Sequence, residues 1–233
     1  MSAKEKKKKK NSSKVRQHKN PHQSLGRETA RQLKAARKIL KKAKLPRDGF
    51  GVAFLGSART RPGHPYYDKT VEAAQAVAAL GYPIIHGGGP GQMEASARGA
   101  KAASGTSIGL CLKLGFKEEV RLEHDLSIWF EEFSPRLDTF RHLSKIAMVF
   151  TPGGIGSMHE AMSIIDHIMQ KKAQRRLVIF YDPCPEKPYW EGFFQWLRGT
   201  VMQEGLLKEE EISFLKVVRS SEELVQLLQS ETK

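Results

Sequence analysis

The sequence predicts a doubly wound α/β domain, in which helices cover both faces of a parallel sheet. From residue 48 onward, short apolar runs alternate with longer amphipathic segments, and Gly-rich turns follow several of the runs. The runs are apolar at successive positions, which is typical of strands buried on both faces. Such strands need helices on each side, and the helices supply the crossovers that parallel strands require.

Seven short runs are expected to form the strands, because each is rich in apolar residues and bounded by turn residues. They are 51–57, 82–89, 106–112, 126–130, 146–154, 176–182 and 214–218. Amphipathic segments between them predict helices over about 67–80, 91–103, 135–143, 156–170 and 189–203. A last helix follows the capping serines of "SSEELVQLLQS".

The net charge of +14 is concentrated at the N-terminus. Residues 1–47 hold 18 of the 39 Lys and Arg but two of the 25 Asp and Glu, which leaves residues 48–233 nearly neutral. We expect a disordered basic tail over 1–25, a basic amphipathic helix or linker over 26–47, and a Rossmann-like domain over 48–233. The tail region could contact nucleic acid weakly or an anionic membrane. Alternatively, it is a solubilising tail whose helix docks on the body.

The composition indicates a soluble protein, with 39% apolar and 27% charged residues and no apolar run long enough to span a membrane. No apolar segment follows the N-terminal lysines, so a secretory signal is not expected. Cys111 and Cys184 are too few for a disulfide framework, and the histidines lack the spacing of metal ligands. We therefore expect a cytoplasmic protein without a metal or cofactor.

Three Gly-rich turns are expected to lie together at one edge of the sheet. They are "GSAR" (56–59), "GGGPGQMEA" (87–95) and "PGGIGSMHE" (152–160), and each links a predicted strand to a helix. In doubly wound folds, ligands bind outside the carboxyl ends of the strands, where such turns lie. The sequence therefore predicts a ligand site built from these three turns.

The third turn has the residues of an anion site beside a carboxylate. Gly153, Gly154 and Gly156 let the backbone turn sharply and direct N–H groups toward one anion, at the positive end of the helix dipole. Ser157 can donate its hydroxyl to the same phosphate. Glu160 is three residues further on and shares the same helix face. A phosphate and a carboxylate would therefore lie side by side.

A structural alternative is a tight connection in which Ser and Glu form a capping box. The repetition of the Gly-rich pattern at residues 87–95 favours the ligand site over this alternative. Neither turn has the Gly-Lys-Ser/Thr ending of a phosphate loop or a clear dinucleotide fingerprint. A mononucleotide is therefore the expected ligand.

The segments "GGGPGQMEA", "RLDTF" (136–140) and "PGGIGSMHE" together resemble the LOG family, named from the plant "lonely guy" protein. The resemblance extends over about 50–220 and leaves out the basic tail. Members of this family are nucleoside 5′-monophosphate phosphoribohydrolases that were long mislabelled as lysine decarboxylases. The resemblance also implies a homodimer.

The resemblance implies Glu160 and Arg136 as catalytic residues. The spacing from Arg136 to the third turn is about one residue off the family's pattern, so Arg141 stays an alternative. Ser157 replaces the family's Thr and keeps its hydroxyl. The residues implied to bind substrate are Gly153, Gly154, Gly156, Ser157, Ser57, Gly88, Gly89 and Glu94.

The expected activity is hydrolysis of the N-glycosidic bond of a nucleoside 5′-monophosphate to free base and ribose 5-phosphate. Cleavage builds positive charge on the ribose, which a nearby carboxylate stabilises. Adenine, guanine, pyrimidines and the prenylated adenine of cytokinin ribosides all stay open as the base. Two alternatives are a non-catalytic carrier of a nucleotide or of the molybdenum cofactor, and an RNA-binding module that acts through its tail.

Overall fold

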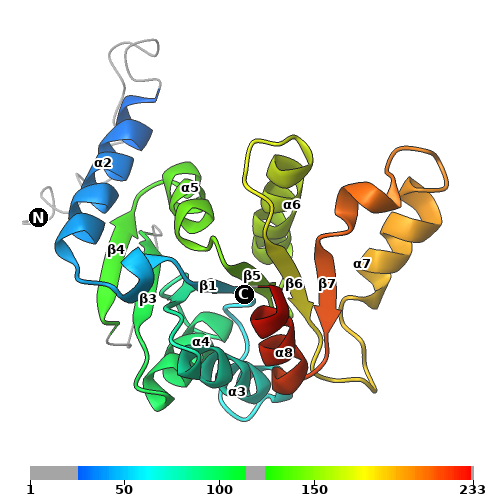
Figure 1. The fold of residues 1–233 in the computed structure, drawn as a ribbon, viewed down its shortest axis with the longest axis horizontal. Helices are drawn as coiled ribbons and strands as arrows, with labels where there is room; N and C mark the ends of the chain where they lie inside the picture. The colour runs from blue at the N-terminus through cyan, green and yellow to red at the C-terminus, as the bar shows by residue number, and fades with distance from the viewer. Residues whose placement is uncertain (1–25, 114–123, 232–233) are drawn as a thin grey trace, which may run out of the picture.

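Seven parallel strands form the sheet at the centre of the computed structural model, which describes residues 26–113 and 124–231 (Figure 1). The strands are β1 (Val52–Leu55), β2 (Ile84–His86), β3 (Ser107–Leu112), β4 (Leu126–Phe130), β5 (Ala147–Phe150), β6 (Leu177–Tyr181) and β7 (Leu215–Val218). Their order is β4-β3-β2-β1-β5-β6-β7, with parallel pairing throughout. After β1, the chain adds β2, β3 and β4 in order on one side of β1. It then returns to the other side of β1, where it adds β5, β6 and β7. The topological switch point therefore lies between β1 and β5.

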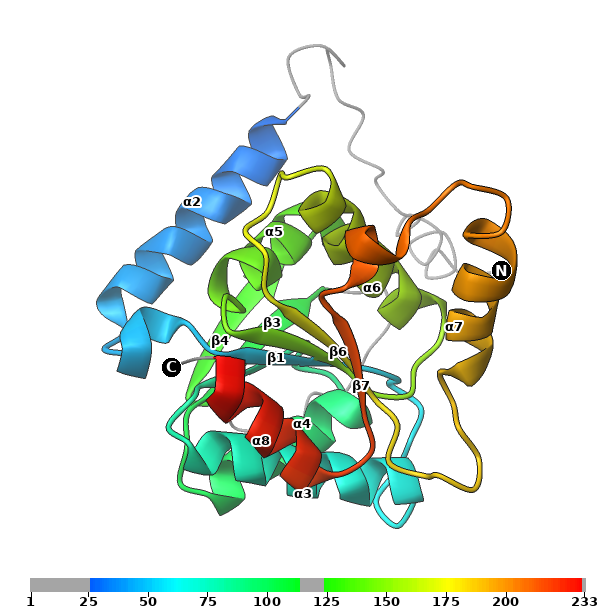
Figure 2. The same ribbon diagram turned by 45° about the vertical axis from the view of Figure 1, so that its right-hand side comes forward.

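Helices cover both faces of this sheet, as Figure 2 shows. On one face lie α3 (Pro65–Ala79), α4 (Gln92–Ala102) and α8 (Ser221–Glu231). On the other lie α2 (Arg27–Lys42), α5 (Phe133–Leu143), α6 (Ile155–Met169) and α7 (Glu191–Trp196), which runs on into a π-helical turn, η3 (Leu197–Val201). The single-turn helices η2 (Pro46–Gly49) and η4 (Glu209–Ile212) precede β1 and β7. The predicted doubly wound α/β fold is confirmed.

Strand β1 shows why its sequence is apolar at every position. Val52 and Phe54 pack into the apolar cluster shared with α3, α4 and α8, whereas Ala53 and Leu55 pack into the cluster on the opposite face. All four side chains are buried. Because successive side chains of a strand point to opposite faces, a central strand between two helical layers is apolar throughout.

The basic helix α2 packs on the body of the protein. Ala36 and Gln32 are buried against the body, and the Gln32 side-chain oxygen accepts hydrogen bonds from the backbone N–H groups of Glu131 (2.9 Å) and Glu132 (3.4 Å). These two residues connect β4 to α5. The helix of this region is therefore docked on the body of the protein, as one of the two interpretations of the sequence expected. The disordered tail expected over 1–25 lies outside the described residues.

We predict that Gln32→Ala lowers the free energy of unfolding by about 1 kcal/mol, because the backbone N–H groups of Glu131 and Glu132 lose their shared, partly buried acceptor. Lys38→Ala on the same helix is the matched control, since Lys38 is exposed, and we expect it to change stability by less than about 0.5 kcal/mol. Chemical denaturation of the full chain measures both values. Equal effects of the two substitutions would contradict the docking role of Gln32.

Candidate functional site

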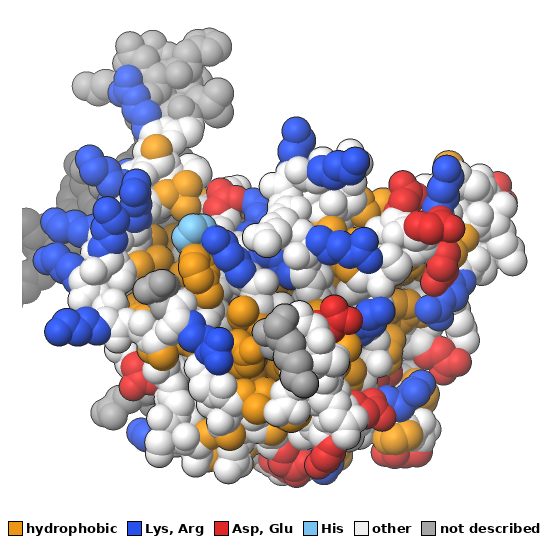
Figure 3. All heavy atoms as spheres, viewed as in Figure 1, with side chains coloured by type: hydrophobic (Ala, Val, Ile, Leu, Met, Phe, Trp, Pro, Cys, Tyr) orange, Lys and Arg blue, Asp and Glu red, His pale blue; other side chains and the backbone are white. Residues whose placement is uncertain are grey.

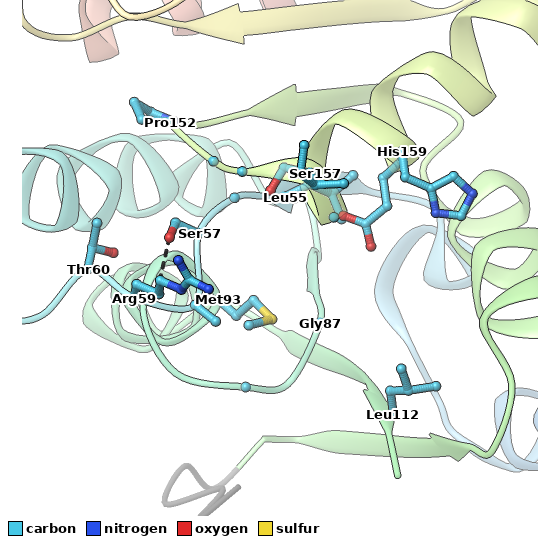
Figure 4. Close-up of a pocket in the computed structure, with 18 of the residues that line it drawn as sticks. Leu55, Ser57, Arg59, Thr60, Gly87, Met93, Leu112, Pro152, Ser157 and His159 are labelled. Atoms are coloured by element: carbon cyan, nitrogen blue, oxygen red, sulfur yellow. Dashed lines mark hydrogen bonds between the residues drawn. The ribbon is translucent and has the colours of Figure 1, made fainter. Parts of the chain in front are cut away.

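A cavity of about 750 Å³ opens at the carboxyl ends of the central strands, beside the switch point. Its walls include the turns that follow β1, β2 and β5, which the sequence predicted to meet. Figure 4 shows Ser57 and Arg59 from the first turn, Met93 from the start of α4, and Ser157 and His159 from the start of α6. The predicted convergence of the three turns is therefore observed.

The backbone of Ser57 joins the three turns. Its N–H donates to the carbonyl of Pro152 in the third turn (3.2 Å), and its carbonyl accepts the N–H of Gln92 after the second turn (2.8 Å). The Ser57 hydroxyl oxygen accepts the N–H of Arg59 (3.1 Å), the bond drawn in Figure 4. These bonds fix the first turn against both of its neighbours.

Two glycines allow close approaches in the cavity wall. Gly88 has a φ of +73°, a left-handed conformation that favours glycine, and a Cβ there would overlap the Cys111 sulfur. A Cβ on Gly153 would overlap the Ser157 side chain. The absence of side chains at these two positions therefore brings backbone directly to the cavity surface.

Helix α6 begins at the cavity wall without a side-chain cap. Gly154 is its N-cap residue, and the first bond within the helix runs from the N–H of Met158 to the Gly154 carbonyl (3.0 Å). The N–H groups of Ile155, Gly156 and Ser157 therefore have no carbonyl partner within the helix. All three residues line the cavity. This helix end can bind an anion, since its free N–H groups and dipole both favour negative charge.

Glu160 and Arg136 form an ion pair in the same wall. A terminal guanidinium nitrogen of Arg136 lies 3.0 Å from a carboxylate oxygen of Glu160, and the two side chains are 11% and 16% exposed. The Arg136 Nε donates to the carbonyl of Leu110 (2.7 Å), and its guanidinium lies 5.0 Å from the centroid of the Phe140 ring. Arg136 is thus held in place and presents one edge to Glu160.

Burial sets the proton affinity of this carboxylate. Removal from water raises the pKa of Glu160 above its ordinary value, and the charge and hydrogen bond of Arg136 oppose part of the rise. A carboxylate with a raised pKa accepts a proton more readily than an exposed one. The site therefore places a candidate general base within one helical turn of an anion-binding helix end.

The other predicted residues divide into those in the cavity wall and those outside it. Ser57, Gly88 and Gly89 line the cavity with the third turn. Glu94 is not among the lining residues and pairs instead with Arg98 on α4 (2.7 Å). Arg141 also lies outside the lining, where it binds Asp138 and the Ser163 hydroxyl. Of the two candidate arginines, the structure therefore brings Arg136 to Glu160.

Several lining residues were not predicted, and Tyr189 shows why. Its hydroxyl donates to the Gly153 carbonyl (2.7 Å), although 36 residues separate the two. The Asp182 carboxylate accepts the N–H groups of Tyr189 and Trp190 (2.9 and 3.2 Å), which fixes the loop that carries Tyr189. The sequence analysis did not single out Arg59, His64, Tyr66, Met93, Phe133, His159 or Tyr189. The sequence around Trp190 is rich in aromatic residues, which is typical of packed segments, but this composition does not indicate a contact with the third turn.

The part of the chain that the structure describes contains no group of three or more His, Cys, Asp and Glu residues arranged to hold a metal ion. Within that same part, no helix has the length and apolar character needed to cross a membrane. Cys111 and Cys184 are both free thiols and both buried.

Comparison with protein families gives one match. A family model described as "possible lysine decarboxylase" matches residues 93–228, which is more than half of the chain. The matched span contains Arg136, Glu160 and the whole third turn. The resemblance to the LOG family inferred from the motifs is thereby confirmed. No curated protein matches the chain.

Solved structures share the fold at low sequence identity. The molybdenum cofactor carrier protein of Chlamydomonas reinhardtii is 18% identical, with a TM-score of 0.54 over 77% of this chain and 95% of its own. The molybdenum cofactor binding protein of Rippkaea orientalis is 17% identical, with a TM-score of 0.52 over 79% and 96%. DNA processing protein A of Streptococcus pneumoniae is 15% identical, with a TM-score of 0.51 over 81% and 62%. At these identities, the similarity is one of fold.

Proposed function

We propose that this chain, which belongs to the family described as possible lysine decarboxylases, hydrolyses the N-glycosidic bond of nucleoside 5′-monophosphates. The products would be the free base and ribose 5-phosphate. One observation carries the proposal: the partly buried Glu160–Arg136 pair lies in the same cavity wall as the uncapped start of α6. This wall can hold a phosphate and place a carboxylate beside the sugar attached to it.

The start of α6 is the proposed phosphate site. The N–H groups of Ile155 and Gly156 would donate to the phosphate oxygens, together with the hydroxyl of Ser157. The helix dipole favours the dianion further. Because the Ser157 side chain is buried and Gly153 lies against it, the hydroxyl has a restricted position, which limits the entropy lost on binding.

Glu160 is the proposed catalytic base. As the bond between C1′ and the base nitrogen breaks, its electron pair leaves with the base and positive charge develops on the ribose. The Glu160 carboxylate would stabilise that charge and accept a proton from the water that attacks C1′. The departing base must gain a proton on its nitrogen, and the proton that Glu160 takes from the water would supply it, so that one water is consumed and Glu160 is regenerated as a carboxylate. Arg136 would fix the carboxylate and offer its positive charge to the phosphate or the departing base.

We also propose that the protein is a cytoplasmic homodimer. Phe133 and Ile155 line the cavity yet are 58% and 88% exposed, and Met162 on α6 is 39% exposed. Large apolar side chains at a cavity mouth are typical of surfaces that a second chain covers. Light scattering at micromolar concentration should give twice the mass of one chain. The mass of one chain would contradict the dimer.

The proposed reaction is tested by incubating the purified full chain with AMP, GMP, CMP, UMP and a prenylated AMP. We expect at least one of them to release free base and ribose 5-phosphate in equal amounts, measured by chromatography. The matching nucleosides are the control, because without a phosphate they lack the group that the start of α6 would bind. A carrier would bind a nucleotide and leave the whole panel intact over hours, and that result would overturn the proposal.

Two substitutions separate chemistry from binding. Glu160→Gln should lower kcat about 100-fold or more and leave nucleotide binding largely intact, because it removes a charge that matters most in the transition state. Ser157→Ala should instead raise KM, because it removes one phosphate donor and keeps the carboxylate. Steady-state kinetics on the best substrate measures both. Turnover near the wild-type value in Glu160→Gln would disprove the catalytic assignment.

A further inference from the structure

A second hollow lies at the opposite end of the sheet from the proposed active site. It has a volume of about 560 Å³ and is lined by residues that come just before β5 and β6 and at the start of β7. Four of the lining side chains are cationic, namely Lys145, Arg175, Arg176 and Lys216, against the single carboxylate of Glu231. This end of the sheet is therefore strongly positive.

These cations lack acidic partners among the described residues. Arg176 is buried and donates to the carbonyls of Arg141 (2.6 Å) and Ser144 (2.9 Å), where α5 ends. Arg175 donates to the Ser213 hydroxyl (2.8 Å). Among the side chains of residues 26–47, 50–113 and 124–231, no ion pair involves any of the four cations. Carbonyl and hydroxyl oxygens accept some of the hydrogen bonds that Arg175 and Arg176 donate, but these neutral groups do not compensate the positive charge.

A third hollow continues this positive region toward α2. It lies between α2 and α5 and has a volume of about 710 Å³. Its floor is largely apolar, with Leu33, Leu40 and Leu143 among the lining residues, and its charged lining residues are Arg37, Lys41 and Lys44 against Asp138. Contacts connect it to the second hollow. The Lys145 ammonium lies 4.2 Å from the centroid of the Phe50 ring, and Phe50 packs edge-on against His142, which lines the third hollow.

We call these seven cations the basic track, which consists of Arg37, Lys41, Lys44, Lys145, Arg175, Arg176 and Lys216. In Figure 3, Lys and Arg side chains gather over α2 and continue across the upper part of the same face. Two carboxylates, Asp138 and Glu231, line the same hollows. The charged residues of the track are thus mostly positive, and they border two depressions, one of which has a largely apolar floor.

We propose that the basic track binds the sugar-phosphate backbone of a single nucleic-acid strand. A row of cations without acidic partners matches a row of phosphates, and binding releases the counterions that the phosphates hold. This binding would be separate from the proposed hydrolase activity, because the track and the cavity lie at opposite ends of the sheet.

The surroundings of the track favour phosphate contacts over base stacking or membrane binding. Phe214 beside Arg175 is buried, so its ring cannot stack on a base. A helix that inserts into a membrane surface needs a free apolar face, but the apolar face of α2 packs on the body through Ala36. We therefore expect binding that depends on salt and varies little with base sequence.

The test measures anisotropy of a fluorescein-labelled single-stranded oligouridylate with the full chain over a series of salt concentrations. Two variants neutralise separate parts of the track, Lys145→Gln/Arg175→Gln/Lys216→Gln and Arg37→Gln/Lys41→Gln/Lys44→Gln. Each variant should raise Kd about 10-fold or more. Each should also reduce the magnitude of the slope of log K against log salt by about 2, because each of the three lost phosphate contacts contributes about 0.7 to that slope. The control, Lys69→Gln/Lys101→Gln/Lys187→Gln, removes the same charge at exposed residues that line none of the hollows to which the track residues belong.

Loss of affinity in both track variants, with the control close to wild type, supports the proposal. The proposal is overturned if all three variants bind alike, because overall charge or the N-terminal residues would then explain binding. It is also overturned if vesicles of anionic phospholipid or polyglutamate bind more tightly than the oligonucleotide. Thermal unfolding checks that each variant folds, and the two track variants are independent, so a folding defect in one leaves the other to decide.

Discussion

The site depends on the backbone hydrogen bonds at the switch point between β1 and β5. The carbonyl of Leu55 accepts the N–H of Thr151, and Ser57 then bonds to Pro152 on one side and to Gln92 on the other. Neighbouring helices diverge from the sheet at this edge, so the turns between them leave a crevice. Because backbone atoms make these bonds, they hold the three turns together directly, provided that the glycines at the close approaches, such as Gly56 and Gly91, are kept. A few side chains placed on this backbone frame, such as the Ser157 hydroxyl, can then provide the contacts to a ligand.

The ion pair depends on a second set of contacts that begins in the basic N-terminal helix. Gln32 on α2 holds the backbone of Glu131 and Glu132 at the start of α5, and α5 carries Arg136 to Glu160 on α6. The helix that contributes most to the charge of the folded chain is therefore also a support for the proposed catalytic pair. Its outer face remains free to present the basic track.

Local patterns explain which features the sequence could predict. The central strands were recognisable because burial on both faces makes them apolar throughout, whereas the edge strands β4 and β7 are apolar although partly exposed. Ser157 and Glu160 were recognisable because they are three residues apart on one helix. The choice between Arg136 and Arg141 was not decidable, since both are on α5 and the packing of α5 against α6 determines which one faces Glu160. Tyr189 reaches the third turn through a loop whose course is set by tertiary contacts, and Glu94 has a local partner that removes it from the cavity.

The most direct test of this account is a crystal structure of the Glu160→Gln variant with AMP bound. We expect the phosphate at the N–H groups that begin α6, within hydrogen-bond distance of the Ser157 hydroxyl, and C1′ of the ribose next to the side-chain amide at position 160. This arrangement would join the two halves of the site in one ligand. A phosphate bound away from α6, or a ribose directed away from position 160, would contradict the account.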